Sequence, residues 1–390
     1  MSASRGPRVV HVSHTAHLGG AELALVRLLA QDPPWVPAIC APPAGDAFAP
    51  LDHEGVAVRR CLPHLPSGGT QSRNPVLAMR YLAAMGRGAR ALRREPLARQ
   101  ADVVHANTAA AAIMCALAGA ASRPLVVHLR DIATPESLGR FGLAAFTRIA
   151  LPRADAVIAN SRSTLDLVGD LLGPDVLRAV IASPIGLARP ATAFGVRPAV
   201  GTVGMIGRLQ RRKGQHVFLA AFARAFGGTA VRAHLAGAPL PGERTYVDQL
   251  RRQAGDLGIA DQVTFLGHVE DTTGFLASLD ILVHASILPE AMGQTVLQGL
   301  AHGLPLVATA GGGPSEWLRS GSNALVVEPA DPDALAAAMT WLAGSYETRS
   351  RLAVAAAGTP GILTDAECTA LHGEFFDRVW RRRRGAGEAA

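Results

Sequence analysis

Residues 7–30, PRVVHVSHTAHLGGAELALVRLLA, contain the pattern of apolar residues from which the fold class can be predicted. Residues 7–13 are a short apolar run rich in valine, residues 14–20 form a loop with two glycines, and residues 21–30 place apolar side chains at helical spacing. The sequence therefore predicts a strand, a loop and a helix in this order. A strand made of continuous apolar residues is typical of a parallel sheet that helices cover on both faces.

The same alternation of strand and helix recurs along the chain. Further strand-length apolar runs stand at 102–107, 124–131 and 155–161, and then at 200–208, 231–237, 262–269, 280–286, 304–310 and 323–329. Two such series predict an α/β fold with two doubly wound, Rossmann-like parallel-sheet domains. The segment 185–199, rich in Pro, Gly and Ala, is the predicted linker between them. Ligands of such sheets bind beyond the carboxyl ends of the strands, so functional residues are expected in the loops that follow strands.

The composition limits the classes of protein to which the chain can belong. The chain has 390 residues, of which 49% are hydrophobic and 18% charged, as in folded globular proteins. Its longest apolar run, residues 108–121, is shorter than the roughly 20 residues of a membrane span and predicts a buried helix. The lack of a signal-peptide pattern and the four scattered cysteines predict free thiols in a cytoplasmic protein. The net charge of +7 favours anionic partners, but with 5% aromatic residues and no recognisable nucleic-acid motif, nucleic acid is not expected.

The segment GRLQRRKG, residues 207–214, follows a predicted strand and contains Lys213, the only lysine of the chain. The other 37 of the 38 Lys and Arg residues are arginines. An ammonium is a compact point charge, whereas a guanidinium is a broad planar fork, so a retained lysine indicates a place where a compact cation is required. Arg208 and Lys213 are therefore candidates for binding a phosphate from one loop. A solvent-exposed basic loop is the alternative.

Two other segments fit an ordinary structural role as well as a functional one. Gly19 and Gly20 lie between the first strand and its helix, where backbone N–H groups can approach an anion, although a plain strand-to-helix turn has the same composition. The segment DPD, residues 331–333, has the spacing of a metal motif. However, Asp331 followed by Pro332 is typical of a helix start, and we expect that role rather than metal binding.

A third loop, which follows the strand predicted at 280–286, carries Glu290 ahead of a helix expected to begin near Gly293. The N–H groups of Gly293, Gln294 and Thr295 would form the positive end of that helix, which attracts anions. The Glu290 carboxylate beside it could accept hydrogen bonds from sugar hydroxyls. A helix-capping acid is the alternative reading of Glu290.

At residues 290–308, EAMGQTVLQGLAHGLPLVA, the chain resembles the retaining family 4 glycosyltransferases of GT-B fold, whose signature is two glutamates separated by seven residues. The resemblance extends over most of the chain through GGAEL, DVVHAN, VVHLRD, GRLQRRKG and VTFLGHV, in this order. It implies a GT-B fold with a cleft between its two domains. Residues 1–190 would form the acceptor-binding domain, on which a C-terminal helix at 365–384 packs back, and residues 195–364 would bind the nucleotide sugar.

The resemblance also implies roles for matching residues. Glu290 would bind hydroxyls of the donor sugar, Arg208 and Lys213 would neutralise the diphosphate, and His128 would lie beside the reacting sugar. The positions that match donor-binding residues are Gly19, Gly20, Gly267, His268, Gly293, Gln294, Thr295 and Gln298.

Gln298 departs from the family pattern, because it stands where the signature has its second glutamate, which binds the ribose hydroxyls. An amide accepts a hydrogen bond but lacks the charge of a carboxylate. We therefore expect an active enzyme with relaxed discrimination at the ribose.

The expected function is retaining transfer of a sugar from a nucleotide-diphosphate sugar, of UDP or GDP type, to an acceptor hydroxyl. The acceptor could be a polysaccharide or other glycan, a glycolipid or lipid-linked sugar, or a small natural-product glycoside. Neither a cofactor nor a metal is expected, because basic groups and a helix end would supply the positive charge. A nucleotide-sugar 2-epimerase of the same fold and a non-catalytic nucleotide-sugar-binding protein are the alternatives.

A basic amphipathic helix is predicted near residues 75–100. One face carries Leu77, Tyr81, Met85 and Leu92, and the other carries Arg80, Arg87, Arg90 and Arg94. Such a helix could hold a cytoplasmic protein at the surface of an anionic membrane. Packing on the sheet with a solvated arginine face is the alternative.

Overall fold

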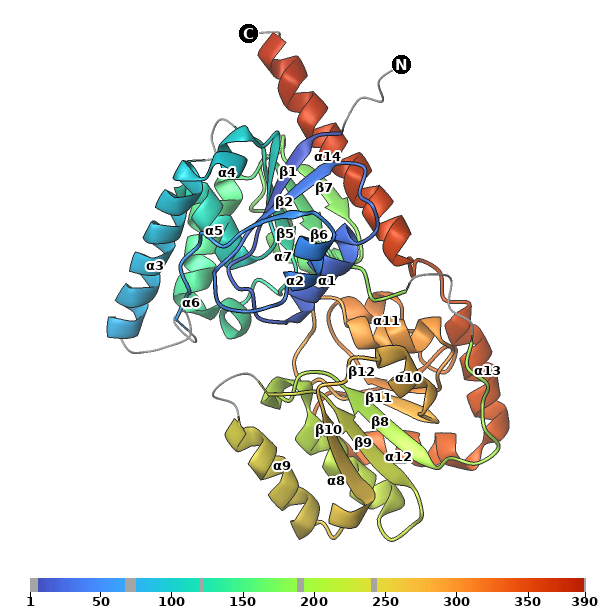
Figure 1. The fold of residues 1–390 in the computed structure, drawn as a ribbon. Coiled ribbons are helices and arrows are strands. Elements are labelled where there is room, and N and C mark those ends of the chain that lie inside the picture. The colour runs from blue at the N-terminus through green and yellow to red at the C-terminus, as the bar shows by residue number, and fades with distance from the viewer. Residues whose placement is uncertain (1–5, 67–74, 120–122, 188–192, 240–243, 389–390) are drawn as a thin grey trace. The chain divides into compact units, whose positions relative to one another are not determined.

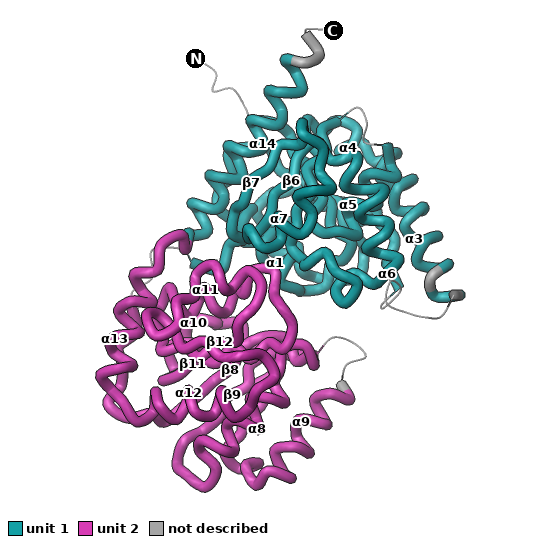
Figure 2. The backbone as a smooth tube through the Cα atoms, turned by 180° about the vertical axis from the view of Figure 1, so that it is seen from behind, with its two compact units in different colours: residues 1–188, 363–390 teal, residues 189–362 magenta. Residues whose placement is uncertain are grey.

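The computed structural model describes residues 6–66, 75–119, 123–187, 193–239 and 244–388. The chain divides into two compact units (Figure 2): residues 1–188 together with 363–390, and residues 189–362. Each unit holds one sheet, and all the strand pairs of the described residues are parallel. The predicted α/β class with two parallel-sheet domains is confirmed.

The sheet of the first unit has the order β3-β2-β1-β4-β5-β6-β7 in the described residues. Its strands are β1 (Arg8–Val12), β2 (Val36–Cys40), β3 (Ala57–Arg59), β4 (Val103–Ala106), β5 (Leu125–Leu129), β6 (Ala156–Ala159) and β7 (Leu177–Val180). The central strands are buried along their whole length, as their continuous apolar runs predict.

Helices cover both faces of this sheet (Figure 1). They are α1 (Gly20–Leu29), α2 (Ala49–His53), α3 (Pro75–Arg94), α4 (Pro96–Gln100), α5 (Ala109–Leu117), α6 (Pro135–Ala145), α7 (Arg162–Gly169) and α14 (Asp365–Glu388), with short helical turns at Phe146–Ala150 and Leu151–Arg153. On one face α3 and α5 pack against Val10, Val104 and Val127. On the other, α1 and α14 pack against alternate residues of the same strands.

Helix α14 belongs to the first unit although it comes last in the chain. Its residues Phe375, Phe376 and Val379 are buried in the core that α1 shares with the sheet. The helix begins at Asp365, as the sequence predicts, but continues to Glu388 rather than ending at 384. Part of the predicted linker, residues 188–192, lies outside the described residues.

The second unit has the strand order β10-β9-β8-β11-β12-β13 in its described part. Its strands are β8 (Thr202–Ile206), β9 (Arg232–Ala236), β10 (Val263–Gly267), β11 (Ile281–His284), β12 (Leu306–Thr309) and β13 (Leu325–Val327). Its helices are α8 (Gln215–Phe226), α9 (Arg244–Asp256), α10 (Thr272–Ala277), α11 (Gln294–Ala301), α12 (Pro332–Gly344) and α13 (Tyr346–Ala357), with short helical turns at Arg211–Lys213, Ala260–Gln262 and Gly313–Glu316. Apolar residues of α8, α9 and α12 fill one face of the sheet, and those of α10 and α11 fill the other.

Two local predictions are confirmed by helix geometry. Asp331 is the N-cap of α12, where its side chain accepts hydrogen bonds from the N–H groups of Asp333 and Ala334. The alanine-rich run at 108–121 contains the largely buried helix α5, capped by Thr108. Among the described residues, no helix has both the length and the apolarity that crossing a bilayer requires.

Candidate functional site

Each sheet has a point at which its strand order reverses. In the second unit β8 lies beside β11, although β9 and β10 come between them in the chain. In the first unit β1 likewise lies beside β4. At such a switch point the loops after the two neighbouring strands run apart and leave room for a ligand at the carboxyl edge of the sheet. The candidate residues, except the side chain of His128, lie at these two carboxyl edges.

In the second unit the switch point brings Lys213 and Glu290 together. Lys213 lies on the loop after β8, Glu290 on the loop after β11, and Lys213 Nζ is 2.5 Å from Glu290 Oε1. The same oxygen accepts a short hydrogen bond from the Ser286 hydroxyl and lies 3.2 Å from His284 Nε2. Among the described residues, no group bonds the other carboxylate oxygen, Oε2.

The electrostatics of this cluster keep Glu290 ionised. Burial by itself would raise the pKa of Glu290, whose exposed fraction is 8%, but Lys213 and His284 outweigh burial and hold this pKa well below its usual range. The cluster is therefore a buried carboxylate paired with the single lysine of the chain. Breaking a buried pair by removing one partner typically costs about 3–5 kcal/mol, since the other charge is left uncompensated.

A backbone hydrogen bond holds the loop that carries Lys213 against the loop after β11. The N–H of Ile287 donates to the carbonyl of Arg212 at 2.9 Å. Gly214, next to Lys213, has φ 73° and lies so close to the sheet that a Cβ there would overlap the carbonyl oxygen of Ala285. A side chain at position 214 would therefore force the two loops apart. The position of the Lys213 ammonium follows from this tight approach.

The backbone of Glu290 is held by the glycine loop that follows β12. Glu290 forms an isolated parallel bridge with Gly312, and the N–H of Gly313 donates to the Glu290 carbonyl at 2.8 Å. A Cβ on Gly312 would overlap that carbonyl, so this approach requires glycine. No role was predicted from the residues for this loop, for Ser286 or for His284. The three adjacent glycines at 311–313 were the signal that could have found the loop.

Helix α11 follows Glu290 directly. Gly293 is its N-cap, Gln294 and Thr295 are its first residues, and the first intrahelical bonds run from the N–H groups of Val296 and Leu297 to Gly293. The N–H groups of Gln294 and Thr295 therefore point out of the helix end. Gln298 lies one turn further along and is buried.

The remaining donor-side candidates lie at the same edge without contacting this cluster. Arg208 follows β8 and is half-buried. Among the described residues, no hydrogen bond or ion pair joins its guanidinium to Lys213 or Glu290. Its backbone carbonyl accepts a hydrogen bond from the Gln215 side chain. Gly267 ends β10, where its carbonyl accepts from Gly237 at 2.6 Å, and His268 beside it is exposed.

The resemblance implies that His128 helps to position the sugar through its side chain or its carbonyl. His128 is the penultimate residue of β5, and its side chain is fully buried on the face that α14 covers. Side chains of a strand alternate between the faces of the sheet, so this one points under α14 rather than toward the carboxyl edge. The residues that do follow β5 at that edge are Arg130 and Asp131.

His128 is the last residue in a series of buried hydrogen bonds that begins at Trp35. The indole N–H of Trp35 can only donate, and this fixes the direction of each bond that follows. Trp35 Nε1 donates to His11 Nε2 at 3.1 Å, so His11 carries its proton on Nδ1 and donates to His105 Nδ1 at 2.9 Å. His105 Nε2 then donates to His128 Nδ1 at 3.1 Å. Every ring in this chain is therefore neutral, which agrees with pKa values that burial lowers, to about 3 for His11 and well below the usual range for the other two.

The carboxyl edge of the first unit carries a buried polar cluster. Arg130 donates from Nε to Asn107 Oδ1 at 2.8 Å and from Nη1 to the Ser183 hydroxyl at 2.7 Å, while its Nη2 is buried without a partner among the described residues. Nearby, the Ser13 hydroxyl donates to Glu22 Oε1 at 3.1 Å. Burial raises the pKa of Glu22 to about 7 and lowers that of Arg130 to about 10. Glu22 is a residue of α1, the helix that Gly19 caps.

Replacing Glu22 with glutamine is expected to stabilise the protein in alkaline buffer only. The pKa of Glu22 is higher in the folded protein than in the unfolded chain, so ionisation of Glu22 lowers the free energy of unfolding of wild type as the pH rises through about 7. The decrease is about 2 kcal/mol between pH 5.5 and pH 8.5. Glutamine does not titrate and can still accept from Ser13. Urea unfolding of both proteins at the two pH values measures the effect; an equal difference at both would contradict the raised pKa.

Both halves of the chain match glycosyltransferase domain families. Residues 36–184 match the family described as glycosyl transferase 4-like domain, and residues 200–345 match glycosyl transferases group 1. By fold and by domain content, the chain belongs to the GT-B glycosyltransferases. HepE of Anabaena, solved in complex with UDP and glucose, aligns with a TM-score of 0.77 and 25% identity over 95% of this glycosyltransferase and 99% of HepE.

Curated relatives are also glycosyltransferases. This glycosyltransferase is 34% identical to the lipopolysaccharide core biosynthesis glycosyltransferase LpsE of Rhizobium meliloti, over 53% of this chain and 59% of LpsE. It is 29% identical to the 2-deoxystreptamine N-acetyl-D-glucosaminyltransferase of Streptomyces fradiae, over 60% of this chain and 59% of that enzyme. The chain thus spans about three fifths of the length of the curated relatives it matches.

Proposed function

We propose that this glycosyltransferase moves a sugar from a nucleotide-diphosphate sugar to an acceptor hydroxyl and retains the configuration at the anomeric carbon. The observation that carries the proposal is the Lys213–Glu290 pair at the switch point of the second unit. The likeness to HepE, which was solved with UDP and glucose, supports a donor of this kind.

The pair offers groups of both signs to such a donor. Glu290 uses Oε1 for Lys213, Ser286 and His284, so Oε2 is left to accept hydrogen bonds from sugar hydroxyls. Lys213 has three N–H groups, and Glu290 takes one of them. The other two can donate to oxygens of the diphosphate. One side-chain pair would thus align the sugar and its leaving group.

Stabilisation of the leaving diphosphate would carry the reaction. Negative charge builds on that group as the bond to the sugar breaks, and positive groups fixed in advance lower the barrier. Lys213, Arg208 and the N–H groups at the start of α11 are the groups we assign to this task. With these in place, we propose chemistry that needs neither a metal nor a cofactor.

The base of the donor would lie further along the same edge, near Gly267 and His268 at the end of β10. Gln298, one turn into α11, would reach the ribose. Because its amide lacks a negative charge, we expect it to hold the two ribose hydroxyls less strongly than a carboxylate would. A UDP or GDP sugar is the proposed donor.

The first unit would bind the acceptor, with the buried Arg130 cluster at its carboxyl edge, and the Gly19–Gly20 turn at the same edge would contact the donor. The names of the relatives favour a lipopolysaccharide-type glycan, free or lipid-linked, or a small aminoglycoside-like acceptor. We do not assign a contact with the sugar to the side chain of His128, because it is buried under α14.

Helix α3 gives a reason to propose peripheral contact with an anionic membrane. Its packing face is as predicted, with Met85 and Leu92 buried. Its outer face exposes Met79 and Leu82, with exposed fractions of 62% and 65%, next to the exposed Arg80. Apolar side chains among arginines are suited to the headgroup region of a bilayer.

A panel of UDP-, GDP-, dTDP- and ADP-sugars tests the proposed function. We expect one UDP or GDP sugar to raise the melting temperature and to release its nucleotide slowly by hydrolysis, with faster release when a suitable glycan acceptor is added. Glu290→Gln should lose the turnover, and NMR of the product should show the anomeric configuration of the donor. Interconversion of two donor sugars without release would indicate an epimerase, and binding without either reaction a non-catalytic protein.

The same panel tests the role of Gln298. The Gln298→Glu variant is expected to bind its nucleotide several-fold more tightly, about 1 kcal/mol, because a carboxylate makes charge-assisted hydrogen bonds to the ribose. Donor KM and the ranking of nucleotides measure this change. Unchanged values for both would remove Gln298 from the ribose site.

A further inference from the structure

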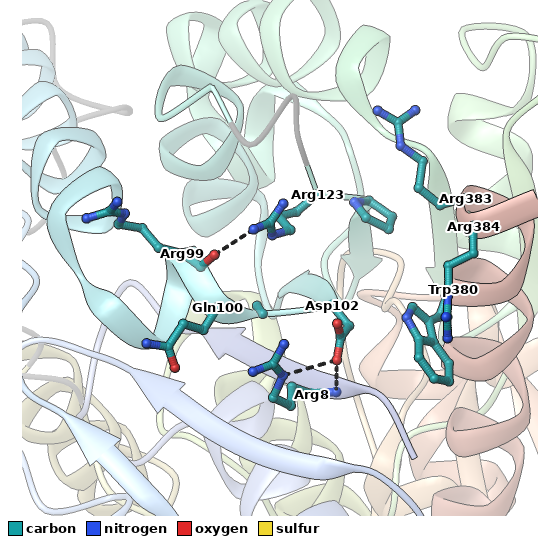
Figure 3. Close-up of a pocket in the computed structure, with 10 residues that line it drawn as sticks. Arg8, Arg99, Gln100, Asp102, Arg123, Trp380, Arg383 and Arg384 are labelled. Atoms are coloured by element: carbon teal, nitrogen blue, oxygen red, sulfur yellow. Dashed lines mark hydrogen bonds and ion pairs between the residues drawn. The ribbon is translucent and has the colours of Figure 1, made fainter. Parts of the chain in front are cut away.

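A cavity of about 460 Å³ opens at the amino edge of the first sheet, away from the carboxyl ends at which the donor and acceptor residues gather. Arg8 begins β1, Asp102 precedes β4 and Arg123 precedes β5, so three neighbouring strands start at this cavity. Arg99 of α4 and the last part of α14 complete its lining (Figure 3).

The lining is strongly basic. It contains five arginines and one acid, Asp102, and therefore carries a net charge of +4. Asp102 is already engaged, because its Oδ2 accepts from the backbone N–H of Arg8 at 2.8 Å and from Arg8 Nε at 3.2 Å. Guanidinium groups gathered in one cavity repel one another unless an anion lies between them.

Several of these side chains have fixed positions. Arg123 Nη2 donates to the carbonyl of Arg99 at 2.8 Å, and the Arg384 guanidinium lies 5.1 Å from the centre of the Trp380 ring (Figure 3). Arg383 comes from the same end of α14. The cations thus come from four separate elements, and part of the ordering that binding requires is already complete.

We propose that this cavity binds a ligand with two or more phosphate groups, at a site separate from the donor site. Guanidinium forks match phosphate oxygens in pairs, and a charge of +4 suits several phosphates rather than one carboxylate. The ligand is either a free polyphosphorylated small molecule or a phospholipid headgroup at a membrane surface. The common chemistry is the cluster of phosphates.

The test is binding of inorganic tripolyphosphate by isothermal titration calorimetry. We expect binding that weakens with added salt. We also expect binding to be about tenfold or more weaker in the variant Arg123→Gln/Arg384→Gln, since this variant loses two cations that form charge-assisted hydrogen bonds with phosphate. The matched control is Arg87→Gln/Arg90→Gln, which removes the same charge from the exposed face of α3 and should bind like wild type. Melting temperatures of both variants check that each one is folded.

Vesicles of phosphatidylcholine with an anionic phospholipid distinguish the source of the phosphates. Vesicle binding that the cavity variant loses and the α3 variant keeps would assign the cavity to lipid headgroups. Loss of tripolyphosphate binding alone would assign it to a free ligand. The proposal is overturned if the cavity variant binds tripolyphosphate and vesicles as wild type does. The proposal is also overturned if only the α3 variant loses vesicle binding and the cavity variant binds tripolyphosphate as wild type does. That result would locate membrane contact on α3. Neither assay measures sugar transfer, so the outcome does not depend on the proposed function.

Discussion

Replacing Lys213 with alanine is expected to lower kcat/KM for the nucleotide-sugar donor by about 10²–10³-fold, the usual cost of removing one fixed donor from a developing negative charge. The ammonium is the cation that contacts Glu290 in the described structure, so its loss also leaves that buried carboxylate without its main partner. Steady-state kinetics with the preferred donor measures the effect. Thermal unfolding of the same variant shows how much of the loss comes from destabilisation.

Lys213→Arg tests whether the shape of the cation matters, because it keeps the charge. The hydrogen bond from the Ile287 N–H to the Arg212 carbonyl holds this loop against the loop after β11, which limits the room for a planar guanidinium beside Glu290 and Ser286. We expect this variant to lose most of the rate. The control is Arg211→Gln, an exposed position on the same loop, which should stay near wild type. Near-wild-type turnover of Lys213→Arg would mean that the single lysine has no special role.

Acid is expected to destabilise the protein at a pH where most folded proteins remain stable. Burial lowers the pKa of His11 to about 3 and of His372 to about 4, and holds the pKa values of His105 and His128 well below 6.5. In the unfolded chain these rings take up protons near pH 6.5, while in the folded chain they stay neutral. The unfolded state therefore binds more protons as the pH falls, and stability decreases.

The size of this effect follows from the four rings. Between pH 7 and pH 5.5 each contributes a loss of about 1 kcal/mol, or about 4–5 kcal/mol together. Glu22 opposes it by about 1–2 kcal/mol, because its raised pKa adds stability as the pH falls below about 7. The expected net loss of about 3 kcal/mol is a large share of the 5–15 kcal/mol that typically stabilises a domain.

Urea unfolding between pH 7.5 and pH 5.5 measures this loss. The matched control is His53→Gln, which removes an exposed histidine outside the buried cluster. His372→Leu keeps an apolar group on the buried face of α14 and should reduce the net loss by about a third, since one of the four rings no longer titrates. A free energy of unfolding that stays constant over this range would show that the histidines are protonated in the folded state.

Much of the fold could be predicted from the residues because its signals are local. The run at residues 8–12, the glycine loop and the apolar spacing of α1 identify one strand–loop–helix unit without any distant contact. Asp331 and Pro332 mark the start of α12 in the same way. The end of α14 was predicted less accurately. Four arginines followed by a glycine are typical of the end of a helix, but this helix continues to Glu388.

The site was predicted less completely, because side chains far apart in the chain build it. Lys213 and Glu290 stand out by residue type and by their place after a strand. Ser286 and His284 look like the end of an ordinary buried strand, and only their approach to Glu290 gives them a role. The Arg130 cluster has no local signature for the same reason: Asn107 and Ser183 come from other parts of the chain.

Apolar periodicity and residue type act over a few neighbours, so the alternation of strands and helices and the loops that carry Lys213 and Glu290 could be predicted from the residues. The contact between Lys213 Nζ and Glu290 Oε1, which joins residues 77 positions apart, could not. That contact depends on β8 lying beside β11, and strand order is set by packing of the whole sheet. Packing also determines that the side chain of His128 lies beneath α14. The face of the sheet that α14 covers depends on the whole folded unit, so the segment VVHLRD alone does not reveal it.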